Sequence, residues 1–159
     1  MEETAATLIL GVGNVALGDE GFGIHVARRI KEIGVSDNVK VEAGGVAGFD
    51  LLGLLPGIQR LVIVDVMDAD MPPGEIGWFE LDPDFKSSEA AKLSFHQVGV
   101  VELLQIAGVI GLKPKVEFLV TRPMHLEWSF ELSPEVQQAA DKAVKFLRNL
   151  FPFCSPPNQ

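Results

Sequence analysis

The stretch TLILGVGNVALGDEGFGIHVARRIKEI, residues 7–33, decides the expected fold. It begins with a continuous apolar run ending in glycine, which is typical of a strand buried on both faces of a parallel sheet. Its last part repeats apolar residues at helical spacing, namely Phe22, Val26, Ile30 and Ile33. The stretch therefore predicts a strand, a glycine-rich loop and a helix, which is the start of an alternating α/β chain.

The same alternation continues to residue 150. Further strands are expected in NVKVEAGG (38–45), RLVIVDVMDA (60–69), EIGWFEL (75–81) and KVEFLVT (115–121). Helices are expected in FDLLGLLPGI (49–58), HQVGVVELLQIAG (96–108) and SPEVQQAADKAVKFLRNL (133–150). Ser133 is the expected N-cap of the last helix and Pro134 its first residue. The stretches 82–94 and 121–132 read as loops.

This order of elements predicts an α/β fold, a three-layer α/β/α sandwich. We expect a mostly parallel five-stranded sheet with helices on both faces. The absence of repeats or linker-like stretches favours a single domain over residues 1–159, with an ordered core of about 6–151 and a mobile tail at 152–159. Sites in such sheets form outside the carboxyl ends of the strands, where the strand order reverses.

Composition excludes several classes of function. The 159 residues include 13 Lys and Arg against 22 Asp and Glu, a net charge of −9, so nucleic acid is not an expected partner. The lone Cys154 cannot form an internal disulfide, and neither a signal peptide nor an apolar run of membrane-spanning length is visible. We therefore expect a cytoplasmic protein without a membrane segment.

Three polar residues stand out because each follows an expected strand. Glu20 lies in the loop after the first strand, Asp65 directly follows LVIV (61–64), and His96 opens a helix after the fourth strand. If the first and third strands are parallel neighbours, their following loops share one edge of the sheet, and a long loop after the fourth strand would bring His96 there. Two carboxylates and one imidazole would form a metal site with open positions.

Each of these residues also has a purely structural interpretation. Glu20 would complement a helix dipole, Asp65 would cap a turn, and His96 would simply begin its helix. Asp19 is the expected cap of the first helix. His25, inside that helix, and His125, in a loop, are weaker candidates for chemistry.

The glycine loop also allows a nucleotide-binding alternative. Gly11 and Gly13 fit the G-x-G-x-x-G pattern, but Ala16 occupies the place of the third glycine. Glu42 resembles the ribose-binding acid of such sites. The acidic pair at 19 and 20 would repel a pyrophosphate, so this alternative is the weaker one.

The motifs taken together resemble the hydrogenase maturation endopeptidases over roughly residues 8–150. The resemblance rests on the order of the parts, since no part is specific alone. The parts are GVGNVALGDEGFGIHVARRI (11–30), GGVAGFDLL (44–52), LVIVDVMDADMPPGEI (61–76), SFHQVG (94–99) and LEWSFELSPEV (126–136).

The resemblance implies an endopeptidase that removes a C-terminal extension from the large-subunit precursor of a [NiFe] hydrogenase after nickel insertion. The metal-binding positions of that family fall on Glu20, Asp65 and His96, which are also the implied catalytic residues. Nickel would be carried by the precursor, so the purified protein is expected to be metal-free or to bind a surrogate divalent ion. A monomer is favoured.

One position departs from the family pattern. Many relatives have aspartate just before the double glycine after the second strand, and here that residue is Ala43. Glu42 is one residue early and would point to the opposite face of its strand. This departure keeps open a non-catalytic escort that checks nickel loading of the large subunit, as an alternative to the protease.

Overall fold

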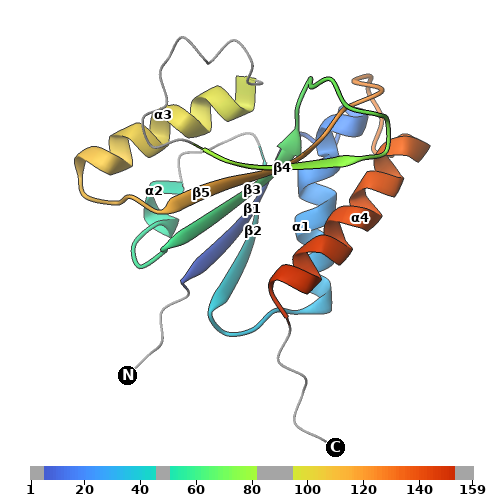
Figure 1. Cartoon of the computed structure of the whole chain (residues 1–159). Helices are drawn as coiled ribbons and strands as arrows, with labels where there is room; N and C mark the ends of the chain where they lie inside the picture. Colours follow the sequence, from blue (N-terminus) through green and yellow to red (C-terminus); the bar gives the residue numbers. More distant parts are fainter. Residues whose placement is uncertain (1–5, 46–50, 82–94, 153–159) are drawn as a thin grey trace, which may run out of the picture.

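The computed structural model describes residues 6–45, 51–81 and 95–152. Over these residues the chain forms a five-stranded sheet with helices on both faces (Figure 1). The elements in chain order are β1 (Thr7–Val12), the 3-10 helix η1 (Gly18–Gly21), α1 (Phe22–Ile33), β2 (Val39–Gly45), α2 (Leu51–Leu54), β3 (Arg60–Val66), β4 (Ile76–Glu80), α3 (Phe95–Val109), β5 (Lys115–Thr121) and α4 (Pro134–Leu150).

The strand order is β2-β1-β3-β5-β4. All neighbouring pairs are parallel except β4 and β5, so β4 is an antiparallel edge strand. The predicted α/β architecture with a mostly parallel five-stranded sheet is therefore confirmed. The strand order reverses between β1 and β3, because the chain first adds β2 on one side of β1 and then β3 on the other. Their carboxyl ends form the switch point at which α/β sheets carry sites.

Two apolar cores lie on the two faces of the sheet. Helices α1 and α4 cover one face, and α2 and α3 cover the other (Figure 1). Strand β3 supplies both cores by alternation: Val62 and Val64 face α1 and α4, whereas Leu61 and Ile63 face α2 and α3. Burial on both faces explains why β1, β3 and β5 are continuous apolar runs in the sequence.

Helix α1 lies unusually close to the sheet because of Gly23. A Cβ atom at this position would lie 2.0 Å from the carbonyl oxygen of Val64 and 2.4 Å from that of Val12. The helix backbone thus rests directly on the ends of β1 and β3. Since η1 immediately precedes α1, this contact also fixes η1 at the carboxyl ends of both strands.

The predicted elements need a few corrections. Ile33 is 46% exposed, so only Phe22, Val26 and Ile30 of the predicted apolar face are buried. Ile33 is the last residue of α1, where the chain turns away at Gly34. Strand β3 ends at Val66, one residue beyond Asp65.

Other predictions are confirmed or lie outside the described residues. Ser133 is the N-cap of α4, since its hydroxyl accepts a hydrogen bond from Val136 N at 3.3 Å. The predicted loop at 82–94 and the tail from 153 onward are outside the described residues. In the part of the chain that is described, no helix is long and apolar enough to cross a membrane.

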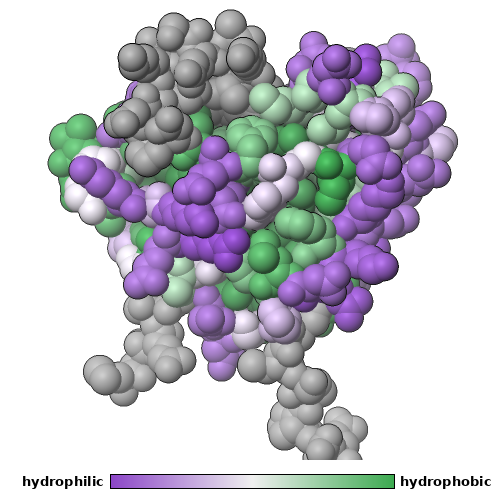
Figure 2. All heavy atoms as spheres, in the orientation of Figure 1, coloured by the Kyte–Doolittle hydropathy of each residue, from purple (hydrophilic) through white to green (hydrophobic). Residues whose placement is uncertain are grey.

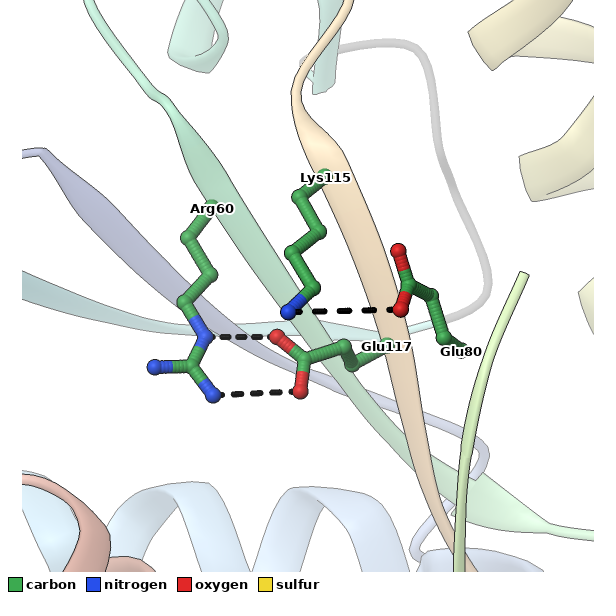
Figure 3. A network of polar contacts seen from close by, with 4 residues as sticks. All are labelled: Arg60, Glu80, Lys115 and Glu117. Carbon is green, nitrogen blue, oxygen red and sulfur yellow. Dashed lines mark hydrogen bonds and ion pairs between the residues drawn. The ribbon is translucent and has the colours of Figure 1, made fainter. Parts of the chain in front are cut away.

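An ion-pair network fixes the amino ends of β3 and β5, at the edge opposite the switch point (Figure 3). The guanidinium of Arg60 donates two hydrogen bonds to the carboxylate of Glu117, which is 3% exposed. Arg60 also lies over the ring of Phe151 at 5.0 Å, and Lys115 reaches Glu80 at 4.0 Å. A buried carboxylate is tolerated here because a bidentate partner compensates its lost hydration.

Candidate active site

Glu20 lies in η1, just beyond the carboxyl end of β1. The glycine loop holds its backbone in place, because Asn14 N donates to Glu20 O at 3.2 Å. Gly13 has a φ of 145°, and a Cβ atom there would lie 1.9 Å from Glu20 O. Only glycine permits this approach, so the loop serves to position the residue that carries a candidate carboxylate.

Asp65 is the next-to-last residue of β3 and is 0% exposed. By the alternation of β3 its side chain shares the face of Leu61 and Ile63, toward α2 and α3. Its Oδ1 accepts a hydrogen bond from Val66 N at 2.8 Å. A carboxylate this deeply buried must be compensated by hydrogen bonds or a charged partner, and Val66 N supplies one such bond.

The topology brings the elements of these two residues together. Strands β1 and β3 are parallel neighbours, and η1 contacts β3 directly. Glu20 and Asp65 therefore lie at the same edge of the sheet, at the switch point. The predicted adjacency of the first and third strands is therefore confirmed, and the joint role of Glu20 and Asp65 stays a prediction.

His96 lies in the first turn of α3, and its side chain is outside the described part of the structure. Because β4 is antiparallel, it ends at the edge opposite the switch point. Helix α3 then runs against the direction of β5 (Figure 1). The 15 residues of α3 span about 21 Å, so the first turn of the helix lies toward the carboxyl edge of the sheet. A third metal ligand would have to come from this edge.

The three-residue metal site stays a prediction. Within the described residues, no group of three or more His, Cys, Asp or Glu side chains is gathered closely enough to hold an ion. Glu20 and Asp65 are among these described residues, whereas the side chain of His96 is not.

Asp19 has a role that the sequence reasoning did not identify. It was expected to cap the first helix, but neither η1 nor α1 has a side-chain cap. Instead the 0% exposed carboxylate accepts hydrogen bonds from Met124 N, His125 N and Ser133 N at 2.7–2.8 Å, and from the Ser133 hydroxyl at 2.9 Å. Asp19 thus ties the loop beside Glu20 to the start of α4.

We predict that Asp19→Asn lowers the free energy of unfolding by about 2–4 kcal/mol. All four contacts of the carboxylate come from donors, so either orientation of the new amide sets an N–H against an N–H. Urea unfolding followed by circular dichroism measures the change. The matched control is Asp141→Asn at the exposed pair with Arg29, which should cost about 0–1 kcal/mol. Equal losses in the two variants would contradict the role of Asp19.

Among the described residues, His25 is not gathered with two other side chains that could bind a metal ion. Burial, together with the nearby Arg28, lowers the pKa of its imidazole, which is therefore neutral at neutral pH. Its Nε2 atom is buried and has no hydrogen-bond partner among the described residues. His125 is exposed and contributes its backbone, not its ring, to the contacts of Asp19.

The nucleotide-binding alternative loses its structural basis. A Cβ atom on Gly11 would lie 2.2 Å from Gly23 O, so this glycine accommodates α1. The space at Gly13 is occupied by Glu20 O. Glu42 faces Lys40 on β2 at 3.9 Å. The glycines therefore serve close contacts within the chain, which accounts for their presence without a bound phosphate.

The sequence is similar to a family of known proteins. The family model described as hydrogenase maturation protease matches residues 24–149. The hydrogenase expression/formation protein HupD of Bradyrhizobium diazoefficiens is 34% identical over 133 residues, covering 82% of this chain and 69% of that protein. The hydrogenase 2 maturation protease of Escherichia coli is 30% identical over 141 residues, covering 87% and 85%.

Solved structures show the same fold. The hydrogenase maturating endopeptidase HybD from E. coli superposes with a TM-score of 0.79 at 28% identity, covering 91% of this chain and 90% of that one. The [NiFe] hydrogenase maturation protease HybD from Thermococcus kodakarensis gives a TM-score of 0.78 at 27% identity, covering 91% and 98%. The similarity thus extends over nearly the whole length of both chains.

Proposed function

Because this chain belongs to the hydrogenase maturation protease family, whose members act on a hydrogenase large-subunit precursor, we propose that it cuts such a precursor only after nickel insertion. The protein is a hydrolase, and its substrate bond would be the one that joins the C-terminal extension to the large subunit. The observation that carries this proposal is the placement of Glu20 and Asp65 at one switch-point edge.

In this proposal the nickel is part of the substrate, held by the precursor. Glu20 and Asp65 would supply carboxylate oxygens to it and His96 an imidazole nitrogen. This mixed set is harder than a thiolate cage, so the protein alone would hold nickel less firmly than a cysteine-rich precursor does. Bound nickel would supply Lewis-acid chemistry at the scissile carbonyl or at a water molecule. The presence of the metal would then license the cut.

The carboxylates of Asp65 and Glu20 lie in different surroundings. Asp65 is buried and braced by Val66 N, so its position is fixed before the substrate arrives. Glu20 is only partly buried and sits in a short 3-10 helix whose backbone is braced by Asn14. Preorganised charge at a reaction centre is more effective than charge that must first be oriented.

We further propose that the reaction takes place in the cytoplasm, because a lone cysteine suits a reducing compartment.

We predict that processing depends on nickel in the precursor and not on metal added to this protein. The experiment incubates the protein with nickel-free and nickel-loaded precursor in parallel, with an external chelator, and follows the precursor mass by mass spectrometry. Only the loaded precursor should lose its C-terminal extension. Equal cutting of the nickel-free precursor would defeat the nickel-sensing mechanism and leave the protease assignment intact.

A second outcome addresses the escort alternative. Tight binding of the loaded precursor without any change in its mass would favour a checking role over cleavage. The escort alternative is kept because Ala43 departs from the family pattern. Ala43 is exposed on β2 and lies in register with Gly11 of β1.

A further inference from the structure

A row of large apolar side chains is exposed in the loop between β5 and α4. The apolar row consists of Met124, Leu126, Trp128 and Phe130, which are 39%, 56%, 81% and 73% exposed. Its members alternate with polar residues along MHLEWSF (124–130). Single exposed apolar residues are ordinary, but four in one short segment mark an interaction surface.

The backbone that carries the apolar row is held firmly. Gly18 N donates to Ser129 O at 2.7 Å, Asp19 N to His125 O at 2.9 Å, and Ser129 N to Ala16 O at 2.9 Å. The carboxylate of Asp19 adds the bonds from Met124 N and His125 N. Leu17 and Ser129 also form a parallel β-bridge. A fixed backbone that displays exposed aromatic side chains is preorganised for binding, because little ordering remains to be done.

The apolar row lies beside the candidate site. It is bonded to residues 16–19, and Glu20 is the next residue of the same loop. The fit is close, since a Cβ atom on Gly18 would lie 2.9 Å from His125 O and 3.2 Å from Glu127 O. A chain bound along the row would therefore reach the switch-point edge that carries Glu20.

Negative charge predominates in the loop that carries the apolar row and in the loop after β3. Glu127 and Glu131 are exposed within the same loop, and Asp68 and Asp70 are exposed in the loop after β3. The two loops are linked, because the guanidinium of Arg122 donates to Met71 O at 3.4 Å. Arg122 is the only Lys or Arg in these two loops, residues 67–75 and 121–133. Such a rim attracts a basic partner and repels an acidic one.

We propose that the apolar row is the docking surface for the large-subunit precursor, and that it binds a precursor segment with apolar side chains flanked by Lys or Arg. This inference rests on the proposed function, since it names the surface through which the same substrate is recognised. The row supplies affinity and register, and the chemistry is left to the switch-point residues. Its aromatic members, Trp128 and Phe130, are the expected centre of the binding energy.

The test combines Trp128→Ala with Phe130→Ala in the full chain. Binding of the nickel-loaded precursor, encoded in the same genome, is measured by calorimetry, and processing is followed by mass spectrometry. We expect Kd and KM to rise at least tenfold and kcat to stay within about twofold, because the row does not touch the reacting atoms. The melting temperature should not fall, since both side chains are exposed. Binding of the wild type should also weaken as salt is raised.

The matched control uses a second apolar patch. Ile106, Val109 and Ile110 are 53%, 87% and 65% exposed at the carboxyl-terminal end of α3, which is green at the left of Figure 2. This end of α3 leads into the amino end of β5, on the far edge from Glu20. Val109→Ala with Ile110→Ala likewise truncates two exposed apolar side chains and should change neither Kd nor KM.

Three other results would each separate the docking proposal from the proposed cleavage or from self-association. Unchanged Kd in the Trp128 and Phe130 variant, or a fall in kcat alone, would overturn the docking proposal while cleavage by the wild type stands. Precursor binding that depends on the row but brings no cleavage would instead support docking and remove the proposed cleavage. A wild-type dimer that the same substitutions convert to a monomer in sedimentation experiments would assign the row to self-association and overturn the proposal.

Discussion

The Asp65→Asn variant should process the nickel-loaded precursor about 100- to 1,000-fold more slowly than the wild type, the range found when one electrostatic contact to a transition state is removed. The substitution removes a negative charge and keeps the shape of the side chain. The amide oxygen of asparagine can still accept the hydrogen bond that Asp65 Oδ1 receives from Val66 N. Circular dichroism of the variant separates a loss of chemistry from a loss of fold.

Glu20→Gln should give a loss of the same order. The backbone contacts that position residue 20 come from Asn14 and Leu17 and do not involve its side chain. Each reaction is followed under single-turnover conditions, and circular dichroism verifies the fold. If the two carboxylates share one ion, the double variant should be little slower than the slower single variant, since groups that act as a unit are not additive.

Glu42→Gln is the matched control for both variants. Glu42 is a half-buried carboxylate on β2 that faces Lys40. It lies one strand away from the switch point between β1 and β3. Its neutralisation should change processing by less than about twofold. Processing by Asp65→Asn at the rate of this control would remove Asp65 from the site.

The sequence alone was sufficient to predict the buried strands and the sheet edge at which Glu20 and Asp65 lie. Strands such as LVIV (61–64) are apolar on both faces, so their burial can be read without knowing their neighbours. Asp65 lies near the end of such a strand, and Glu20 lies in the loop that follows one. Parallel strands bring their carboxyl ends to one edge, so the convergence of these residues follows from topology alone.

The antiparallel direction of β4 and the role of Asp19 were harder to predict. EIGWFEL (75–81) gives no signal of direction, and direction decides at which edge the following chain emerges. The bonding partners of Asp19 lie 105–114 residues away in the sequence, so a local pattern suggested only a helix cap. The alternation in MHLEWSF (124–130) was visible, but its exposure and its anchoring to residues 16–19 depend on contacts that no local pattern shows.

Gly23→Ala should destabilise the protein by at least about 4 kcal/mol, beyond the usual 1–3 kcal/mol cost of overpacking. The new Cβ atom would meet the carbonyl oxygens of Val64 at 2.0 Å and of Val12 at 2.4 Å. Both are backbone atoms of hydrogen-bonded strands, so no side-chain rotation relieves the clash. The helix must move outward by an ångström or more. Its buried residues Phe22 and Val26 would then lose contacts with the sheet.

The same displacement should impair the site before the protein unfolds. Helix α1 follows η1 without a break, so a shift of α1 draws Glu20 away from β3. The control is Gly99→Ala in α3, where nothing lies within 4 Å of the new Cβ atom. That variant should be more stable by about 0.5–1 kcal/mol, because alanine favours a helix over glycine. Thermal unfolding should separate the two variants by roughly 10 °C or more. A melting temperature of Gly23→Ala within two or three degrees of the wild type would show that α1 can shift freely, and that Gly23 does not set the position of Glu20.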